Sequence, residues 1–257
     1  MSEFKIAWLF PDTLFLHGER GNILALSRFA KMAGHTPTVY KVDFNTKEFD
    51  PDAFDVIFCA PGEISSFPAV IEWLTPYKEK LEAFVDQGRP LIVTGTSVAL
   101  FGSRILRQDG SEIVGLNLIS VISKENEDVY GDDNFFKCVY NEQQMKIIGN
   151  QIQMIDIDEI DETKGERPFG ELIYGYGNCG KNTKEGIIKG NSVFTNTLGP
   201  MLVCNPMLTI EIVRVACEKH GKDFQDIDFD MSLENQSYDT KKEFILTKES
   251  ELTNCKR

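Results

Sequence analysis

Two different hydrophobic periods alternate along the first hundred residues. Four short runs rich in apolar and β-branched residues have the length and the flanks of strands. They occupy residues 5–10, 36–42, 54–60 and 91–94. Between them, residues 23–33 and 70–87 repeat apolar side chains every three or four positions, which indicates helices. Strands that alternate with helices predict an α/β fold with a doubly wound, flavodoxin-like and mostly parallel sheet.

The run at 91–94 ends abruptly in small residues, and helical spacing resumes before Gly102. This pattern predicts a sharp turn from a buried strand into a helix, with Gly95 at its tip. In hydrolases and amidotransferases such a turn lifts a nucleophile into the cleft beyond the carboxyl ends of the strands. Gly95 has no side chain, so the sequence predicts the scaffold of such a site without its usual nucleophile.

In a doubly wound sheet, ligands bind at the loops that follow the strands. These loops are expected at residues 11–22, 61–67 and 94–97. In the first of them we interpret His17 as a surface histidine, and Glu19 with Arg20 as a solvated ion pair.

The regular alternation ends after Gly102. Turn residues at Gly110, Gly131 and Gly149 separate short apolar runs, which predicts antiparallel strands at the edge of the sheet. The expected strands are 135–140, 151–157, 172–176 and 192–196, and residues 207–219 are expected to form a closing helix. Residues 1–220 are thus interpreted as one domain, and residues 221–257 as an acidic C-terminal tail, either mobile or a partner-binding arm.

Composition and charge narrow the range of functions. The 257 residues are 42% hydrophobic and 26% charged, as in a globular protein, and no apolar run is long enough to span a membrane. The net charge of −13, without a basic stripe, argues against nucleic acid and against anionic membranes as partners. The first residues show no secretory signal pattern, so a cytoplasmic protein without membrane insertion is expected.

Six scattered cysteines give no sign of a metal site or of a disulfide framework. They lie at Cys59, Cys138, Cys179, Cys204, Cys217 and Cys255, with no C-x-x-C pair among them. Free cysteines are usually buried, and we expect neither a metal nor a cofactor.

Several segments, in one order along residues 5–219, resemble a known family. They are 9–23 with Pro11-Asp12 and Gly21-Asn22, the 59–63 loop, 91–102, 113–118, 174–186, and 194–206 with Gly199-Pro200 and Asn205-Pro206. Together they are similar to the cobyric acid synthase branch of class I glutamine amidotransferases, and within it to the amidotransferase subunit of lipid II isoglutaminyl synthase. The resemblance implies a class I glutamine amidotransferase-like fold and a Mur-ligase-like, ATP-dependent protein as partner.

The chemistry of that family needs a Cys thiolate, a His that activates it, and backbone N–H groups for the oxyanion. Residue by residue, the resemblance places Gly62 in the oxyanion loop, Gly95 at the nucleophile and Leu198 at the base. No Cys lies between residues 60 and 137. The only histidines are His17, His35 and His220. We therefore assign no catalytic residue and expect glutaminase chemistry to be lost.

Cys59, Thr96 and Ser97 are the alternative nucleophiles near the same positions. A hydroxyl needs a neighbouring base at neutral pH, and Thr96 or Ser97 can instead simply cap the following helix. Cys59 ends an apolar strand, where a thiol is usually buried.

Two functions remain open at this point. In the first, the chain is a silent amidotransferase-like subunit that binds or scaffolds a Mur-ligase-like enzyme, with a small-molecule ligand possible in its cleft. In the second, it is an active amidotransferase or hydrolase that uses Cys59, Thr96 or Ser97. Both require Gly62, Gly95 and Leu198 to converge at one cleft.

Overall fold

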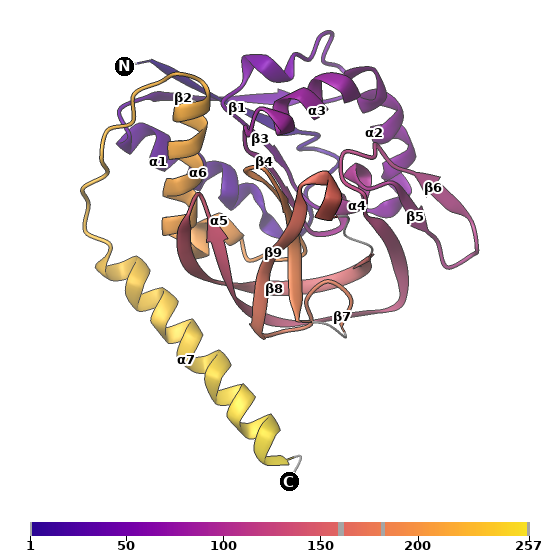
Figure 1. Cartoon of the computed structure of the whole chain (residues 1–257), viewed down its shortest axis with the longest axis vertical. Coiled ribbons are helices and arrows are strands. Elements are labelled where there is room, and N and C mark those ends of the chain that lie inside the picture. Colours follow the sequence, from indigo (N-terminus) through magenta and orange to yellow (C-terminus); the bar gives the residue numbers. More distant parts are fainter. Residues whose placement is uncertain (1, 159–161, 181–182, 256–257) are drawn as a thin grey trace.

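A computed structural model describes residues 2–158, 162–180 and 183–255. Within these residues eleven strands form one sheet, and its parallel part has the order β2-β1-β3-β4-β11. These strands are β1 (Glu3–Leu9), β2 (Thr36–Val42), β3 (Val56–Cys59), β4 (Leu91–Thr94) and β11 (Ser192–Thr195). Strand order reverses between β1 and β3, as in a doubly wound sheet (Figure 1). The predicted α/β class, with a parallel core and antiparallel edge strands, is confirmed.

Two hydrophobic cores enclose the parallel strands. Ile57 and Cys59 of β3 belong to one core, whereas Val56 and Phe58 belong to the other. The first core is covered by α2 (Phe67–Leu74), α3 (Lys78–Asp86) and α4 (Val98–Phe101), and the second by α1 (Arg20–Met32), α5 (Met201–Cys204) and α6 (Pro206–Lys219). Because both faces are buried, the central strands β3 and β4 are continuous apolar runs in the sequence.

The helix predicted at 70–87 is divided in two. A 3₁₀ turn, η4 (Thr75–Tyr77), separates α2 from α3, because Pro76 has no N–H to donate within a helix. The other 3₁₀ turns are η1 (Leu16–Gly18), η2 (Pro51–Ala53), η3 (Ile64–Ser66), η5 (Gly95–Ser97) and η6 (Glu162–Lys164).

The antiparallel part of the sheet is larger than the sequence predicts. Its strands are β5 (Arg104–Leu106), β6 (Glu112–Val114), β7 (Ile122–Tyr140), β8 (Gln143–Asp158), β9 (Glu166–Tyr174) and β10 (Lys184–Lys189). The turns expected at Gly131 and Gly149 are wrong, since both residues lie inside the β7–β8 hairpin. Gly131 approaches the Gln151 carbonyl so closely that a Cβ would clash with it. This glycine therefore allows the two strands to approach each other closely and does not form a turn.

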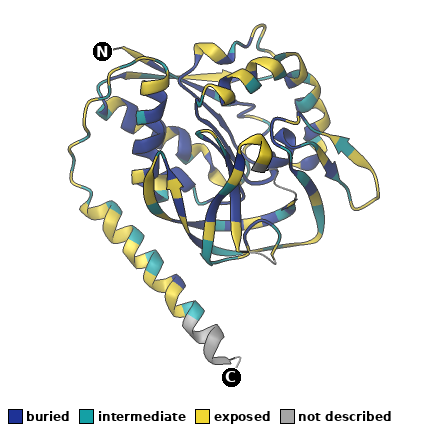
Figure 2. Cartoon of the chain, viewed as in Figure 1, coloured by how far each residue is buried: buried dark blue, intermediate teal, exposed yellow. Residues whose placement is uncertain are grey.

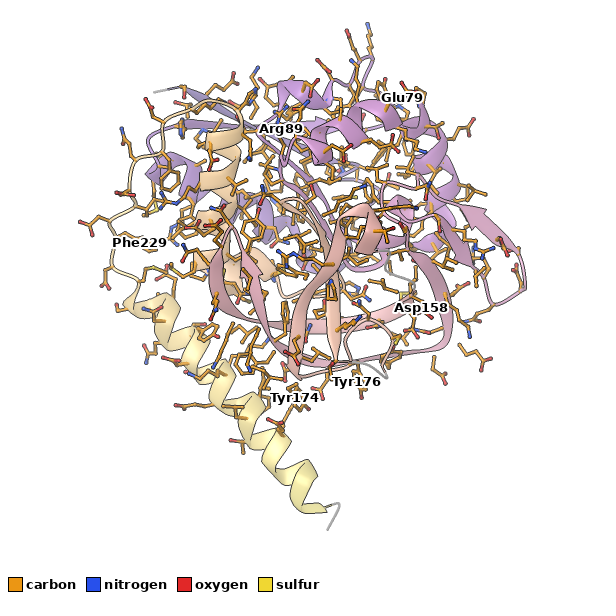
Figure 3. All side chains as sticks on the ribbon, viewed as in Figure 1. Glu79, Arg89, Asp158, Tyr174, Tyr176 and Phe229 are labelled. Atoms are coloured by element: carbon orange, nitrogen blue, oxygen red, sulfur yellow. The ribbon has the colours of Figure 1, made fainter. Side chains whose placement is uncertain are left out.

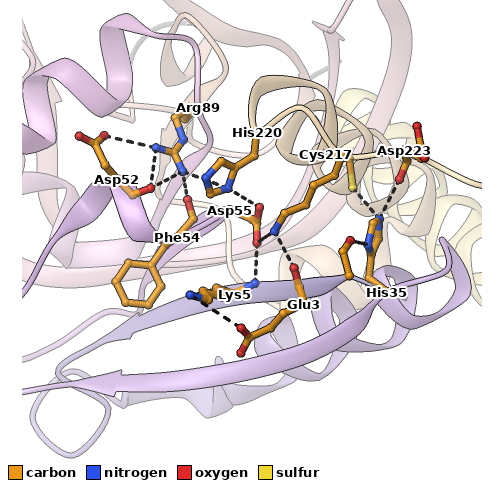
Figure 4. Close-up of polar contacts among 12 residues, drawn as sticks. Glu3, Lys5, His35, Asp52, Phe54, Asp55, Arg89, Cys217, His220 and Asp223 are labelled. Carbon is orange, nitrogen blue, oxygen red and sulfur yellow. Dashed lines mark hydrogen bonds and ion pairs between the residues drawn. The ribbon is translucent and has the colours of Figure 1, made fainter.

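A polar network closes the amino ends of the parallel strands, opposite the edge expected to bind ligands. Asp55 is fully buried, and its carboxylate lies 2.6 Å from His220 Nδ1, from Lys222 Nζ and from the Lys5 backbone nitrogen (Figure 4). The buried Arg89 guanidinium contacts the Phe54 carbonyl beside it. This network ties the region after α6 to the start of the sheet.

The last part of the chain differs from the weakly patterned tail that the sequence predicts. Residues Ser232–Cys255 form α7, which projects from the domain and is exposed over most of its described length (Figures 1 and 2). Its inner face nevertheless contacts the rest of the chain, since Ile245 is fully buried beside Phe135 and Ile148. The Tyr238 hydroxyl also donates to the Lys146 carbonyl at 3.0 Å. In the described part of the chain, no helix is long and apolar enough to cross a membrane.

Candidate functional site

The predicted strand-to-helix turn is present at the carboxyl end of β4. Thr94 ends the strand, Gly95 opens η5, and Val98 begins α4. The backbone of Gly95 is left-handed, with a φ of 60°. This is the strained geometry that holds a nucleophile in related elbows, and glycine adopts it without a Cβ clash.

The three positions that the resemblance selects lie together. A Cβ added to Gly95 would be 2.7 Å from Pro61 Cβ and 3.2 Å from Leu198 Cδ2. Gly62 is tied to the same turn, since its N–H donates to Thr96 Oγ1 at 3.1 Å and its carbonyl accepts from that hydroxyl at 2.6 Å. We call Pro61, Gly62, Gly95 and Leu198 the Gly95 centre.

The space beside Gly95 is filled by apolar side chains. Leu198 is 2% exposed, and both Leu198 and Pro61 stand within contact distance of the missing Cβ. A thiolate on the Gly95 backbone would therefore need the space that Pro61 and Leu198 occupy. The Gly95 centre thus combines a tight strand-to-helix turn with an interior packed like a core.

An open cavity of about 520 Å³ lies on the outer side of Leu198. Most of its lining residues are polar or charged, and Gly95 is not among them. The lining residues are His17, Asp132, Asp133, Asn150, Gln151, Ile152, Leu198, Gly199 and Lys248. We call this cavity the Leu198 hollow. His17 is a solvent-exposed residue at its border, and partial burial of the ring lowers its pKa.

The alternative nucleophiles lie close to the Gly95 centre but have no base. Cys59 is fully buried, and this burial raises the pKa of its thiol to about 12, so it is not a thiolate at neutral pH. Ser97 donates to the Ala60 carbonyl at 2.7 Å, as Thr96 does to Gly62. The recorded partners of these three side chains are backbone groups and one another, and none in the described residues is a histidine or a carboxylate.

The expectation that Thr96 or Ser97 caps the following helix is wrong. Neither hydroxyl bonds an N–H of α4, and no side chain caps that helix. Both hydroxyls face the loop after β3 instead, because the tight turn at Gly95 brings that loop to within hydrogen-bond distance. They hold the 60–62 backbone against the elbow.

The prediction that Glu19 forms a solvated ion pair with Arg20 is wrong, because Glu19 is buried. Its carboxylate accepts from the Gly199 backbone nitrogen at 3.1 Å and from Asn22 Nδ2 at 2.5 Å. Burial raises its pKa from 4.5 to about 7. Asn22 in turn accepts from the Leu202 backbone nitrogen at 2.8 Å. Glu19 and Asn22 thus connect the first loop to the loop that carries Leu198.

A buried polar network, which sequence reasoning missed, surrounds Glu185. Its carboxylate accepts from Thr195 Oγ1 at 2.5 Å, from Thr197 Oγ1 at 2.9 Å and from Gln151 Nε2 at 3.0 Å. Burial raises the pKa of this carboxyl, while the hydroxyl donors lower it. The sequence holds one sign of this network: the polar Gln151 lies in a run otherwise typical of a buried strand.

The same network shapes the 175–180 segment after β9. Gln151 Oε1 accepts from the backbone nitrogens of Tyr176 and Gly177, at 3.0 and 3.3 Å. Asn178 Oδ1 accepts from the Gly186 nitrogen at 2.6 Å. Figure 3 places Tyr176 in the antiparallel part, far from Arg89 at the other end of the molecule. We call Gln151, Asn178 and Glu185, with their partners, the Glu185 frame.

The helix α7 contributes Lys248 to the lining of the Leu198 hollow. Lys248 Nζ lies 2.7 Å from both Asp132 Oδ1 and Asp133 Oδ2, and Lys241 Nζ lies 2.7 Å from Asn150 Oδ1. Tyr174, labelled near α7 in Figure 3, donates to the other oxygen of Asp132 at 2.7 Å. These contacts place two ammonium groups of the tail beside the position that the family gives to its base.

Comparisons with known proteins bear on the family and the fold. No protein-family model matches the chain. The chain is 25% identical over 243 residues to the GatD subunit of lipid II isoglutaminyl synthase from Staphylococcus aureus, covering 92% of this chain and 94% of that protein. It is 24% identical over 226 residues to the GatD subunit from Streptococcus pneumoniae, covering 87% and 84%.

A solved glutamine amidotransferase structure superposes with a TM-score of 0.50 at 12% identity, covering 84% of this chain and 98% of that one. At this identity the superposition supports the fold alone. The sequence relatives extend the likeness along most of the chain. The chain is a glutamine amidotransferase-like protein and a homologue of the GatD subunit of lipid II isoglutaminyl synthase.

Proposed function

We propose that this chain is a GatD-like subunit that no longer hydrolyses glutamine and acts as a binding or scaffolding partner of a Mur-ligase-like, ATP-dependent enzyme. The observation that carries the proposal is the Gly95 centre. Its elbow backbone is retained, while Pro61 and Leu198 fill the place of the reacting groups.

The loss of activity follows from the atoms available at this centre. Glutamine hydrolysis through a thioester needs a sulfur at the elbow and a base beside it, and Gly95 and Leu198 supply neither. When a nucleophile and its base are both removed, only the residual effect of binding and oxyanion contacts remains. Cys59 does not replace them, because its thiol is buried and protonated.

The binding role is supported by what is preserved around the centre. Both relatives are named as subunits of a synthase, so proteins of this kind work beside a second chain. The Glu185 frame satisfies its buried polar groups and fixes the loops at the carboxyl edge without any reacting group. A surface whose loops are held in place, although it carries no reacting group, is suited to binding another protein.

The first test is ammonia release from glutamine by the purified full chain, beside the Cys59→Ala variant. We expect no release above background for either protein. Release that disappears in Cys59→Ala would overturn the loss of glutaminase chemistry and favour a relocated thiol. Release that persists in the variant would point to another group.

The second test is co-purification of the tagged full chain from its native host, followed by identification of bound proteins. We expect an ATP-dependent ligase-like chain to be recovered. A matched deletion of residues 232–257 removes α7 and keeps the 222–231 segment, whose Phe224 and Phe229 pack on the domain. Loss of the partner in the deletion alone assigns the contact to α7. Recovery of only free protein from both forms, at every salt concentration, would contradict the binding role.

A further inference from the structure

The largest cavity among those described lies away from the Gly95 centre, on the antiparallel part of the sheet. It has a volume of about 850 Å³ and is lined by segments of β7, β8, β9 and β10. Cys138, Met145 and Phe169 contribute apolar surface to it. Lys137, Lys146 and Arg167 stand at its border and are exposed. We call this cavity the basic groove.

The basic side chains are brought together by strand register. Lys137 of β7 pairs directly with Lys146 of β8, and on its other side with Glu171 of β9. Like charges directly opposite each other destabilise a strand pair. Neither lysine has an ion-pair partner within the described residues, since no carboxylate lies within 4.0 Å of either ammonium. The unpaired positive charge is therefore left facing solvent at the groove.

Arg167 adds a group of different geometry. One of its terminal nitrogens donates to the Val139 carbonyl at 3.3 Å, which holds the side chain across the neighbouring strands. The remaining N–H groups of a guanidinium form a fork that matches phosphate or carboxylate oxygens. The cavity is lined by these three cationic side chains and by Lys184, against one carboxylate, Glu171. Its lining therefore has a net positive charge, which suits an anion with several oxygens.

The surroundings restrict the ligand further. The chain has a net charge of −13, so it repels extended polyanions over most of its surface, and the basic groove is a local exception. The cavity is far larger than one phosphate group, and its floor includes the nearly buried Phe169. A groove of this size accommodates a small molecule with an apolar or aromatic body.

We infer that the basic groove binds a phosphate-bearing small molecule, with its phosphate or diphosphate group held by Lys137, Lys146 and Arg167. The body of the ligand lies along the apolar part of the lining of the same cavity. This site is separate from the Gly95 centre, and it does not depend on the loss of glutaminase chemistry or on a partner protein. The phosphate can belong to a soluble metabolite or to a lipid headgroup.

The test uses the full chain in two arms. The first is isothermal titration with pyrophosphate, and the second is sedimentation with phosphatidylglycerol vesicles against phosphatidylcholine vesicles. The site variant is Lys137→Glu with Lys146→Glu. The matched control is Lys31→Glu with Lys47→Glu, which makes the same change in net charge at two other exposed lysines. Substituting Lys137→Arg with Lys146→Arg keeps the charge.

We expect saturable pyrophosphate binding that weakens by at least about tenfold in the site variant, persists in the control and the arginine variant, and decreases with added salt. Binding only to phosphatidylglycerol vesicles, with the same dependence on variants, supports the site with a lipid headgroup as its source. No binding in either arm, or equal loss in site variant and control, would overturn the inference. Melting temperatures of all variants verify that they are folded.

Discussion

Two regions at the carboxyl edge of the sheet differ in their interiors: one is filled by apolar side chains and the other by a hydrogen-bonded polar network. In the Gly95 centre, apolar side chains fill the space where reacting groups are expected, and the nearby hydroxyls bond to backbone. The Glu185 frame contacts the loop that also carries Leu198. Its buried carboxylate accepts hydrogen bonds from three side chains. The comparison indicates that loop shape and chemistry are separable. The polar bonds of the frame hold these loops without using any group of the Gly95 centre.

The largest effect is expected from the frame. Glu185→Ala leaves Thr195, Thr197 and Gln151 without their buried acceptor, and each unsatisfied group costs about 1–3 kcal/mol. We expect the free energy of unfolding to fall by about 4 kcal/mol, measured by urea titration. The control is Glu79→Ala on the exposed surface of α3, which should change it by less than about 0.5 kcal/mol. A small loss for Glu185→Ala would mean that the frame does not carry these loops.

Glu19 connects the first loop to the Leu198 loop, and it gives a pH dependence. Its pKa is raised from 4.5 to about 7 in the folded protein, so the folded state binds the proton more tightly than the unfolded state does. Stability should therefore decrease as the pH rises from about 4.5 to about 7 and then level off, a loss of about 3 kcal/mol at most.

Glu19→Gln is the matched variant for this prediction. It keeps the size of the side chain and removes the titration, so its unfolding free energy should lose this part of the slope between pH 5 and pH 8 in denaturant titrations. If wild type and variant have parallel pH profiles, the buried carboxyl does not titrate as described.

The packing of the Gly95 centre can be separated from its backbone strain. Gly95 and Gly110 both have left-handed φ values, of 60° and 82°, but a Cβ would meet Pro61 and Leu198 at Gly95 and nothing within 4 Å at Gly110. Gly110→Ala should cost about 1 kcal/mol for conformation alone, and Gly95→Ala about 2 kcal/mol or more because overpacking is added. Thermal unfolding of the two variants measures the difference. Equal losses would show that the centre has room for a side chain.

A double variant of the Gly95 centre tests the same packing through glutaminase activity. Gly95→Cys with Leu198→His introduces the two residue types that the resemblance places at these positions, yet the added Cβ would be 2.7 Å from Pro61 Cβ. We expect no glutaminase activity in an ammonia-release assay. Recovery of activity would mean that the surrounding frame had kept the full site geometry and that only the two side chains were missing.

The smallest effect is expected at α7. Lys241 and Lys248 are partly exposed, and surface ion pairs contribute about 0.2–1 kcal/mol each. Replacing both by Met should leave the melting temperature nearly unchanged and speed hydrogen exchange in α7. Lys242→Met, which breaks contacts within the helix alone, an ion pair with Asp239 and a cation–π contact with Tyr238, is the control. Unchanged exchange in the double variant would mean that Ile245 and Tyr238 alone hold the helix.

The sequence by itself determined the parallel half of the fold. Strands β3 and β4 are buried on both faces, so they appear as short apolar runs, and the elbow is visible because small residues interrupt such a run. The sequence also gives the prediction that Gly95 and Leu198 occupy the positions where the resembled family has its Cys and His, because that prediction needs only the order of the motifs.

Only the tertiary structure decided the rest, because it depends on contacts between distant positions. Thr195 and Gln151 look like ordinary polar residues until register brings them to Glu185. Lys137 and Lys146 make no basic stripe in the sequence, and the β7–β8 hairpin places them face to face. The helix α7 has little periodicity of its own, so its position follows from the charges and the apolar patch that the folded domain offers it.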